Sequence, residues 1–112
     1  MSLEEQRQGT GVVVRMLGNY RAGDSAVELE GVLDRIVREE KGPIVLDMTN
    51  LKTLDSTALG VIAGCGRFLH AVGRELYLAG PNERVALLFK LTQLDAVFPI
   101  VPTVESAPGL SQ

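Results

Sequence analysis

The sequence predicts an α/β fold built on a mixed or largely parallel sheet. Short apolar runs that are typical of strands alternate with longer segments in which apolar residues recur at helical spacing. The run Ile44–Met48 has no polar alternation, which is typical of a central strand covered on both faces. At 112 residues, the chain is predicted to form one domain over residues 1–112, with its core at about residues 10–107.

The beginning of the chain is predicted to be mostly extended. Val12–Leu17 is β-branched and apolar, which predicts a strand. Residues Leu3–Arg7 are expected to pair with it as a weak edge strand. The stretch Gly18–Gly23 is predicted to be a loop. Tyr20 and Arg21 could contact a partner from this loop, although a solvated loop is the simpler interpretation.

A first helix is predicted to follow this loop. Ser25 and Glu28 form the pattern of a capping box, in which the serine hydroxyl accepts from the Glu28 N–H and the carboxylate reaches back. Gly42 is expected to be the C′ residue, and Pro43 cannot continue the helix. The apolar residues with helical spacing are Leu29, Val32, Leu33, Ile36 and Val37.

The second half of the chain is predicted to hold two more helices and two more strands. In order these are a helix over residues 55–72, a strand over 76–79, a shorter helix marked by Val85, Leu88 and Phe89, and an edge strand over 97–101. Gly80, Pro81 and Asn82 are expected to form a turn and a helix cap. The tail Pro108–Gln112 is predicted to be frayed.

Composition limits the classes of function. The net charge is −3, with no tryptophan and no basic run, so a nucleic-acid-binding surface is not expected. No apolar run is long enough to span a bilayer, and the N-terminus has no hydrophobic signal region. The single cysteine cannot form an internal disulfide. We therefore expect a cytoplasmic chain, although a soluble domain of a larger membrane protein would look the same.

The junction of Asp55 and Ser56 is the main candidate site. It lies where the chain enters a long helix, and the first N–H groups of a helix lack partners and form the positive end of its dipole. Such a position suits a serine N-cap and also suits a phosphate group. Asp55 is expected to cap the helix itself or to orient the Ser56 hydroxyl. Thr57 is a second candidate acceptor, for which a residue of the first helical turn is the simpler interpretation.

Three segments of the sequence form a recognisable pattern: Ile44–Asp47 followed by Leu54–Gly60, then Gly73–Pro81, then Leu91–Ile100. Together they resemble the STAS domain family, which includes the bacterial anti-sigma factor antagonists. Their order and spacing match the family pattern over about residues 12–107. The chain departs from that pattern twice. Ala58 stands where the family motif usually has glycine, and Pro108 and Gly109 cut short the helix that usually ends the domain.

The resemblance implies a four- to five-stranded mixed sheet with helices mainly on one side, and a protein-binding switch. In such antagonists the serine after the motif aspartate, here Ser56, is phosphorylated by the anti-sigma factor, which is a serine kinase. The unphosphorylated form binds this kinase and frees a sigma factor. Phosphorylation separates the two proteins, and a phosphatase resets the switch. The alternative is a STAS scaffold or regulatory module beside a membrane transporter, without a phospho-switch.

The second helix is predicted to have a core face and an open face. Ala58, Ile62, Cys65, Leu69 and Val72 share the core face, and the opposite face carries Ser56, Gly60, Ala63, Gly64, Arg67 and Ala71. A glycine inside a helix costs about 0.5–1 kcal/mol relative to alanine, so Gly64 on an open face needs a reason. Either the fold packs closely there, or a partner backbone approaches beside Asp55, Ser56 and Thr57 with Arg67 as polar anchor.

No set of nucleophile, base and orienting group can be assembled, so an enzyme is not predicted. No cofactor and no metal site are predicted either. Cys65 and His70 lie about 140° apart around the helix and do not face each other. A buried thiol and a solvated histidine near the helix C-terminus are the expected states of these two residues. Asp47 ends a strand, where α/β sheets bind ligands, but no glycine-rich phosphate loop accompanies it.

Overall fold

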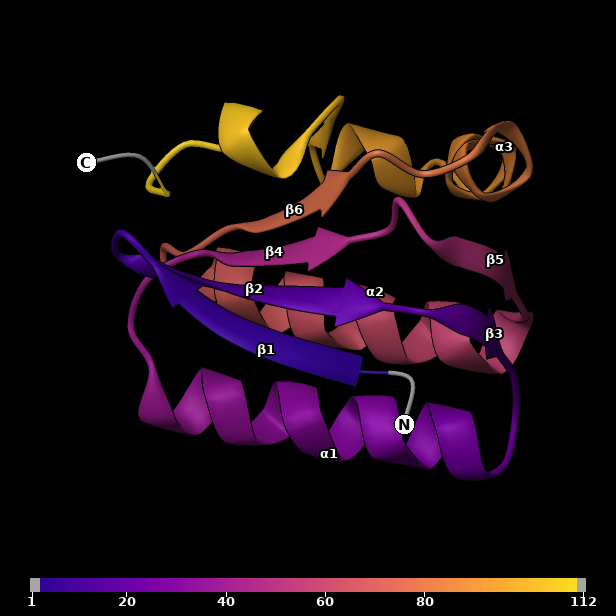
Figure 1. Cartoon of the computed structure of the whole chain (residues 1–112), viewed down its shortest axis with the longest axis horizontal. Coiled ribbons are helices and arrows are strands. Elements are labelled where there is room, and N and C mark those ends of the chain that lie inside the picture. Colours follow the sequence, from indigo (N-terminus) through magenta and orange to yellow (C-terminus); the bar gives the residue numbers. More distant parts are fainter. Residues whose placement is uncertain (1–2, 111–112) are drawn as a thin grey trace.

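The structure is a computed structural model that describes residues 3–110 (Figure 1). Its strands are β1 (Leu3–Gln8), β2 (Gly11–Met16), β3 (Gly18–Tyr20), β4 (Ile44–Asp47), β5 (Leu51–Leu54), β6 (Leu76–Ala79) and β7 (Ile100–Val101). Its helices are α1 (Asp24–Glu39), α2 (Ser56–Ala71) and α3 (Glu83–Leu91), with two short 3-10 helices, η1 (Leu94–Ala96) and η2 (Val104–Ser106). The α/β fold class is thus confirmed.

Five strands form one mixed sheet in the order β1-β2-β4-β6-β7. β1 runs antiparallel to β2, and the other neighbouring strands are parallel. Ile44 of β4 pairs with Val12 of β2 on one side and with Leu76 of β6 on the other. β4 is therefore the central strand, as its unbroken apolar run predicts, and the expected edge strand near the N-terminus is confirmed.

The helices lie mainly on one side of the sheet, and Figure 1 shows α2 behind the strands. Side chains alternate between the two faces of a strand, so every second residue of β2, β4 and β6 points toward the helices. Val14, Leu46 and Leu78 are three of these residues, and all are fully buried in the main core. The helices contribute Leu29, Leu33, Ile36, Ile62, Leu69 and Phe89 to the same core.

The other face of the sheet is covered by the C-terminal segment. Val13, Val45 and Ala79 of the strands form a second apolar cluster with Ala107 and Leu110. Leu110 is only 2% exposed. The Thr10 backbone N–H also donates to the Gly109 carbonyl at 2.9 Å. The prediction of a frayed tail is therefore wrong for residues 108–110, while residues 111 and 112 lie outside the described residues.

The predicted loop at residues 18–23 is in part a strand. β3 pairs with β5 in a small parallel sheet, and Tyr20 pairs with Leu54. Tyr20 is fully buried in the core. A contact between Tyr20 and a partner protein, considered as one use of this loop, is therefore wrong, because the side chain points inward and stabilises the fold.

The ends of α1 differ from the prediction. Its N-cap is Gly23, and no side chain in the described part of the chain caps this helix end. The Ser25 hydroxyl accepts from the Arg21 N–H at 2.9 Å and donates to the Arg21 carbonyl at 3.0 Å. The predicted capping box is wrong because this hydroxyl is already engaged by the preceding turn. The C-cap is Glu40, and Gly42 instead packs so closely that a Cβ there would lie 1.6 Å from the Thr10 carbonyl oxygen.

The predicted edge strand near residue 99 is shorter than expected. It is reduced to β7, which lies at the edge of the sheet next to β6. Phe98, just before it, is 1% exposed and belongs to the main core, although Val97 is exposed. The predicted cap at Asn82 is confirmed, since its side chain accepts from the Val85 N–H.

Candidate functional site

The N-terminus of α2 is capped by Asp55. Its Oδ1 accepts from the Ala58 N–H at 2.9 Å, and its backbone is extended, as an N-cap requires. Ser56 is therefore the first residue within the helix. The interpretation of Ser56 as the N-cap is wrong, because the carboxylate one residue earlier already satisfies the first-turn donor. The serine hydroxyl has no capping role to perform.

Asp55 also joins α2 to the loop between β3 and α1. Its Oδ2 accepts from the Ala22 N–H at 2.8 Å, and its own N–H donates to the Tyr20 carbonyl at 3.0 Å. The N–H groups of Ala58 and Ala22 lower the pKa of the Asp55 carboxyl, and the positive charge of Arg21 adds to this effect. The sequence carries no signal of this contact, because it joins two segments that the chain places far apart.

Ser56 and Thr57 are both exposed at the start of α2. The Ser56 hydroxyl makes no hydrogen bond with any residue in the described range 3–110, and neither does the hydroxyl of Thr57. Ser56 follows directly on the fixed carboxylate of Asp55. The site therefore presents a free, solvent-facing hydroxyl on a rigid frame, next to a negative charge and at the positive end of a helix dipole.

The core face of α2 is partly as predicted. Ala58, Ile62 and Leu69 are buried, and Cys65 is half-buried. The prediction that Val72 lies on the core face is wrong, because Val72 is the C-cap, leaves the helical path and is 53% exposed. The prediction that Ala63 lies on the open face is also wrong, since Ala63 is 4% exposed. The buried arc of α2 is therefore wider on one side than helical spacing predicts.

Three glycines of α2 have two different surroundings. Gly60 and Gly64 are exposed, and a Cβ built at either meets no described atom outside its own helix within 4 Å. Gly66 is buried, and a Cβ there would lie 2.3 Å from the Phe98 ring. Close packing within the fold therefore explains Gly66. Close packing does not explain Gly64, so the interpretation that the fold requires a glycine at this position is wrong.

Arg67 lies on the open face of α2 and is exposed. Its guanidinium has no ion pair or hydrogen bond with the described part of the chain. The open face thus combines two bare glycine positions with one unpaired cation, within a few turns of Ser56. The structure brings five of the predicted site residues onto this accessible surface: Ser56, Thr57, Gly60, Gly64 and Arg67.

Three other side chains that could carry chemistry, those of Cys65, His70 and Asp47, lie in surroundings that do not form a reactive site. Burial raises the pKa of the Cys65 thiol to about 11, which keeps it protonated and weakly nucleophilic at neutral pH. His70 lies 3.7 Å from a Glu75 carboxylate oxygen at the surface. The buried Asp47 carboxylate accepts from the Thr49 N–H and hydroxyl. Within residues 3–110, no three His, Cys, Asp or Glu side chains are grouped to hold a metal ion.

In the described part of the chain, no helix combines the length and the apolar character that crossing a bilayer requires.

Comparison with known proteins places the chain in a family. The STAS domain family model matches residues 5–107. The anti-sigma-B factor antagonist of Staphylococcus aureus is 34% identical over 67 residues, which are 60% of this chain and 62% of that protein. The matched stretch therefore spans less than two thirds of that relative's length.

Solved structures share the fold. An anti-sigma factor antagonist from Mycobacterium paratuberculosis has a TM-score of 0.76 at 25% identity, over 92% of this chain and 86% of that one. The unphosphorylated form of the anti-sigma factor antagonist SpoIIAA has a TM-score of 0.73 at 18% identity, over 92% and 90% of the two chains. Its phosphorylated form, from Bacillus, has a TM-score of 0.74 at 19% identity, over 92% and 93%. At such identities the two SpoIIAA structures establish only the fold.

Proposed function

We propose that this chain, which belongs to the STAS domain family, is an anti-sigma factor antagonist that is switched by phosphorylation at Ser56. The unphosphorylated protein binds an anti-sigma factor that is also a serine kinase, and a sigma factor is released. The kinase then phosphorylates Ser56 and the pair separates. A phosphatase that acts on phosphorylated Ser56 restores the binding form. The protein works as a binding module, not as an enzyme, in the cytoplasm.

The observation that carries this proposal is the free hydroxyl of Ser56. It lies at the first position of α2, is exposed, and has no hydrogen bond with the described residues. Asp55 satisfies the helix cap, so modification of Ser56 does not remove a structural contact. The names of the S. aureus and M. paratuberculosis relatives support the same class of function.

Electrostatics supply the switch. Phosphorylation adds a charge of about −1.5 to −2 at neutral pH. The lowered pKa of Asp55 keeps that neighbouring carboxylate charged, so the phosphate adds to an existing negative site. In a closed protein interface the phosphate would have to lose its water beside a like charge, which is unfavourable by several kcal/mol. The helix dipole favours the phosphate in the free protein, so the modified protein stays folded.

The partner is proposed to contact the surface formed by Asp55, Ser56, Thr57, Gly60, Gly64 and Arg67. A flat glycine surface permits a partner backbone to come close, and Arg67 offers an unpaired cation for a hydrogen-bonded anchor. Thr57 stands beside Ser56 and is expected to contact the partner without accepting phosphate.

The test is phosphorylation by candidate anti-sigma factor kinases with ATP, followed by mass spectrometric mapping of the modified residue. Wild type and Thr57→Ala should each gain one phosphate on Ser56, and Ser56→Ala should gain none. Binding of the unphosphorylated and phosphorylated proteins to the same kinase is then measured by titration. Stoichiometric phosphate on Ser56→Ala, or equal affinity of the two forms, would contradict the proposal.

A further inference from the structure

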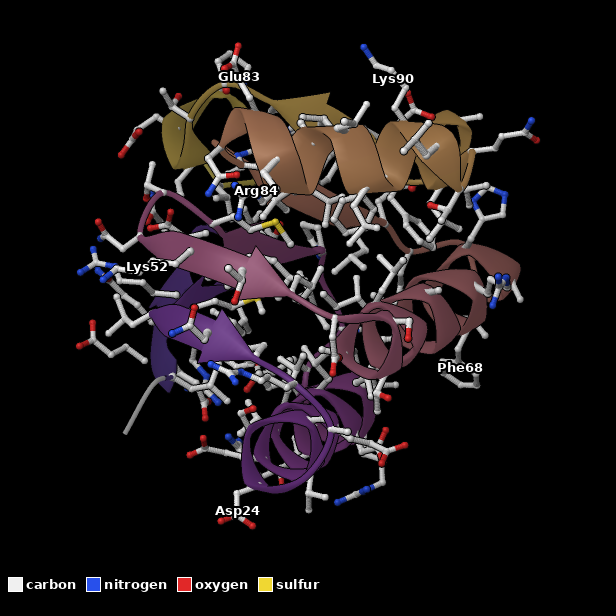
Figure 2. All side chains as sticks on the ribbon, turned by 90° about the vertical axis from the view of Figure 1, so that its right-hand side faces the viewer. Asp24, Lys52, Phe68, Glu83, Arg84 and Lys90 are labelled. Atoms are coloured by element: carbon white, nitrogen blue, oxygen red, sulfur yellow. The ribbon has the colours of Figure 1, made fainter. Side chains whose placement is uncertain are left out.

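A groove of about 370 Å³ lies between α1 and α2, on the outer surface of the helical layer. Five residues of each helix line it. Leu33 and Val37 from α1, with Val61 and Cys65 from α2, form its apolar floor. Figure 2 shows the two helices side by side, with Phe68 projecting outward from α2 on the side toward α1. Phe68 is 54% exposed, although its ring could bury a large apolar area in a complex.

The groove is open because Gly60 and Gly64 line its α2 side without side chains. The two residues are four apart, so they lie on the same face of α2, one turn from each other. Any larger residue there would extend into the groove, since nothing in the described fold occupies the space above either glycine. Another backbone can therefore come into direct contact with the backbone of α2 at these two positions.

The charged residues that line the groove follow one another along α1, with two negative side chains before one positive side chain. Glu30 and Asp34 line the groove one helical turn apart on α1, and Arg38 lines it one turn further along the same helix. None of these three side chains has an ion pair or hydrogen bond with the described residues. A ligand that filled the groove would meet two carboxylates toward the Ser56 end and one guanidinium toward the far end.

We propose that this groove seats an amphipathic helix of the anti-sigma factor, which carries small residues against Gly60 and Gly64 and a lysine or arginine against Glu30 and Asp34. This inference rests on the proposed function, which names the partner. The apolar floor and Phe68 supply the hydrophobic contact of a helix in a groove, and the order of charges selects one direction of that helix. The groove continues from the Ser56 surface, because Gly60 lies one turn after Ser56 on α2.

The single cysteine of the chain provides a direct reporter of this contact. Cys65 lies in the groove floor, so a helix seated there should cover its thiol. The rate at which a maleimide alkylates Cys65 at mildly alkaline pH is followed by the increase in mass of this chain. The rate is measured for the protein alone and with a saturating amount of the kinase that phosphorylates Ser56. We expect alkylation to be at least about tenfold slower in the complex. An equal rate in a saturated complex would overturn the groove as the seat.

Two pairs of variants test the walls of the groove. Gly64→Gln should fold and weaken kinase binding by about tenfold or more, whereas Gly31→Gln should bind as wild type, because Gly31 is an equally open helix glycine that does not line the groove. The double variant Glu30→Lys/Asp34→Lys should weaken binding to a similar degree. Its control is Asp95→Lys/Glu105→Lys, which reverses two exposed carboxylates outside the groove.

The outcomes separate this inference from the proposed function. Circular dichroism melts first establish that all four variants fold. If Gly64→Gln and the double variant Glu30→Lys/Asp34→Lys both bind the kinase with the affinity of wild type, the groove is not the binding site. The Ser56 switch would remain intact. Failure of the wild-type protein to bind any anti-sigma factor kinase would overturn both. Equal weakening by test and control variants would also overturn the groove, since the effect would then not be local.

Discussion

The two sides of α2 use glycine for opposite reasons. On the buried side, Gly66 makes room for the Phe98 ring, and a Cβ there would lie 2.3 Å from it. On the open side, Gly60 and Gly64 have free space above them. The first glycine is required by the fold. The other two lower helix stability without any packing gain inside the described chain, and the proposed partner contact would supply that gain.

The largest effect is expected for Gly66→Ala. The new methyl group would overlap the buried Phe98 ring, which is enclosed in the core and has little room to move. Overpacking of this kind usually costs about 1–3 kcal/mol, more than the helix propensity gained by replacing glycine. Thermal or urea unfolding measures the change.

A control for Gly66→Ala is the double variant Gly66→Ala/Phe98→Leu. The smaller side chain removes the overlap, so the alanine should cost less in this background than in wild type. Equal stability of wild type and Gly66→Ala would show that the buried side of α2 is not tightly packed, and the contrast between the two sides would be lost.

A smaller loss of stability is expected for Asp55→Ala. This substitution tests whether Asp55, and not Ser56, stabilises the start of α2. The substitution removes the acceptor for the Ala58 and Ala22 N–H groups. The pKa of Asp55 is lowered in the folded protein, so its contribution is present above the unfolded pKa of about 3.9 and is lost as pH falls through the folded pKa.

The measurement for Asp55→Ala is a series of melts across pH. The difference in melting temperature between wild type and variant should be largest near neutral pH and should narrow below about pH 4. Ser56→Ala, melted at the same pH values, should follow wild type throughout. A difference for Asp55→Ala that stays constant down to strongly acidic pH would contradict the proposed role of the charged carboxylate.

For Ser56→Asp we expect a change in stability of no more than about 1 kcal/mol, because a negative charge at the first helical position is favoured by the dipole. Binding to the kinase should weaken, since the new carboxylate places like charge beside Asp55 at the interface. Ser56→Asn is the matched neutral control and should bind more tightly than Ser56→Asp. A large loss of stability with intact binding would mean that this end of α2 serves the fold.

Periodicity and motif spacing predicted much of the fold. The strands β2, β4 and β6, the helix α2 and the Asn82 cap of α3 all follow from local pattern. The packing of the C-terminal segment was not predicted, because Leu110 is a single apolar residue after Pro108 and Gly109. Nothing in the local sequence shows that it covers the second face of the sheet. β3 was missed for a similar reason, since its pairing with β5 is decided by distant residues.

The candidate site was predicted in position but not in detail. Ser56 and the open glycines follow from the helix and its motif, whereas the cap at Asp55 and its link to Ala22 depend on geometry. Ala63 was misplaced because Phe98 packs on that side of α2, next to Gly66, and widens the buried arc. The α1 wall of the groove was missed because Glu30 and Asp34 look like ordinary solvated residues until α2 is placed beside them.

The smallest effect, and the one that completes the comparison, is expected for Gly64→Ala. It is the same substitution as Gly66→Ala on the opposite side of the helix, and it should have the opposite sign. Free space around the added methyl removes any packing cost, so the better helix propensity of alanine should raise stability by up to about 1 kcal/mol. Gly31→Ala, at an equally open position on α1, should give a similar gain. Differential scanning calorimetry of the three alanine variants decides the point. A loss of stability for Gly64→Ala, with a gain for Gly31→Ala, would mean that Gly64 is needed within the fold, and the proposed partner contact would lose the support of this glycine.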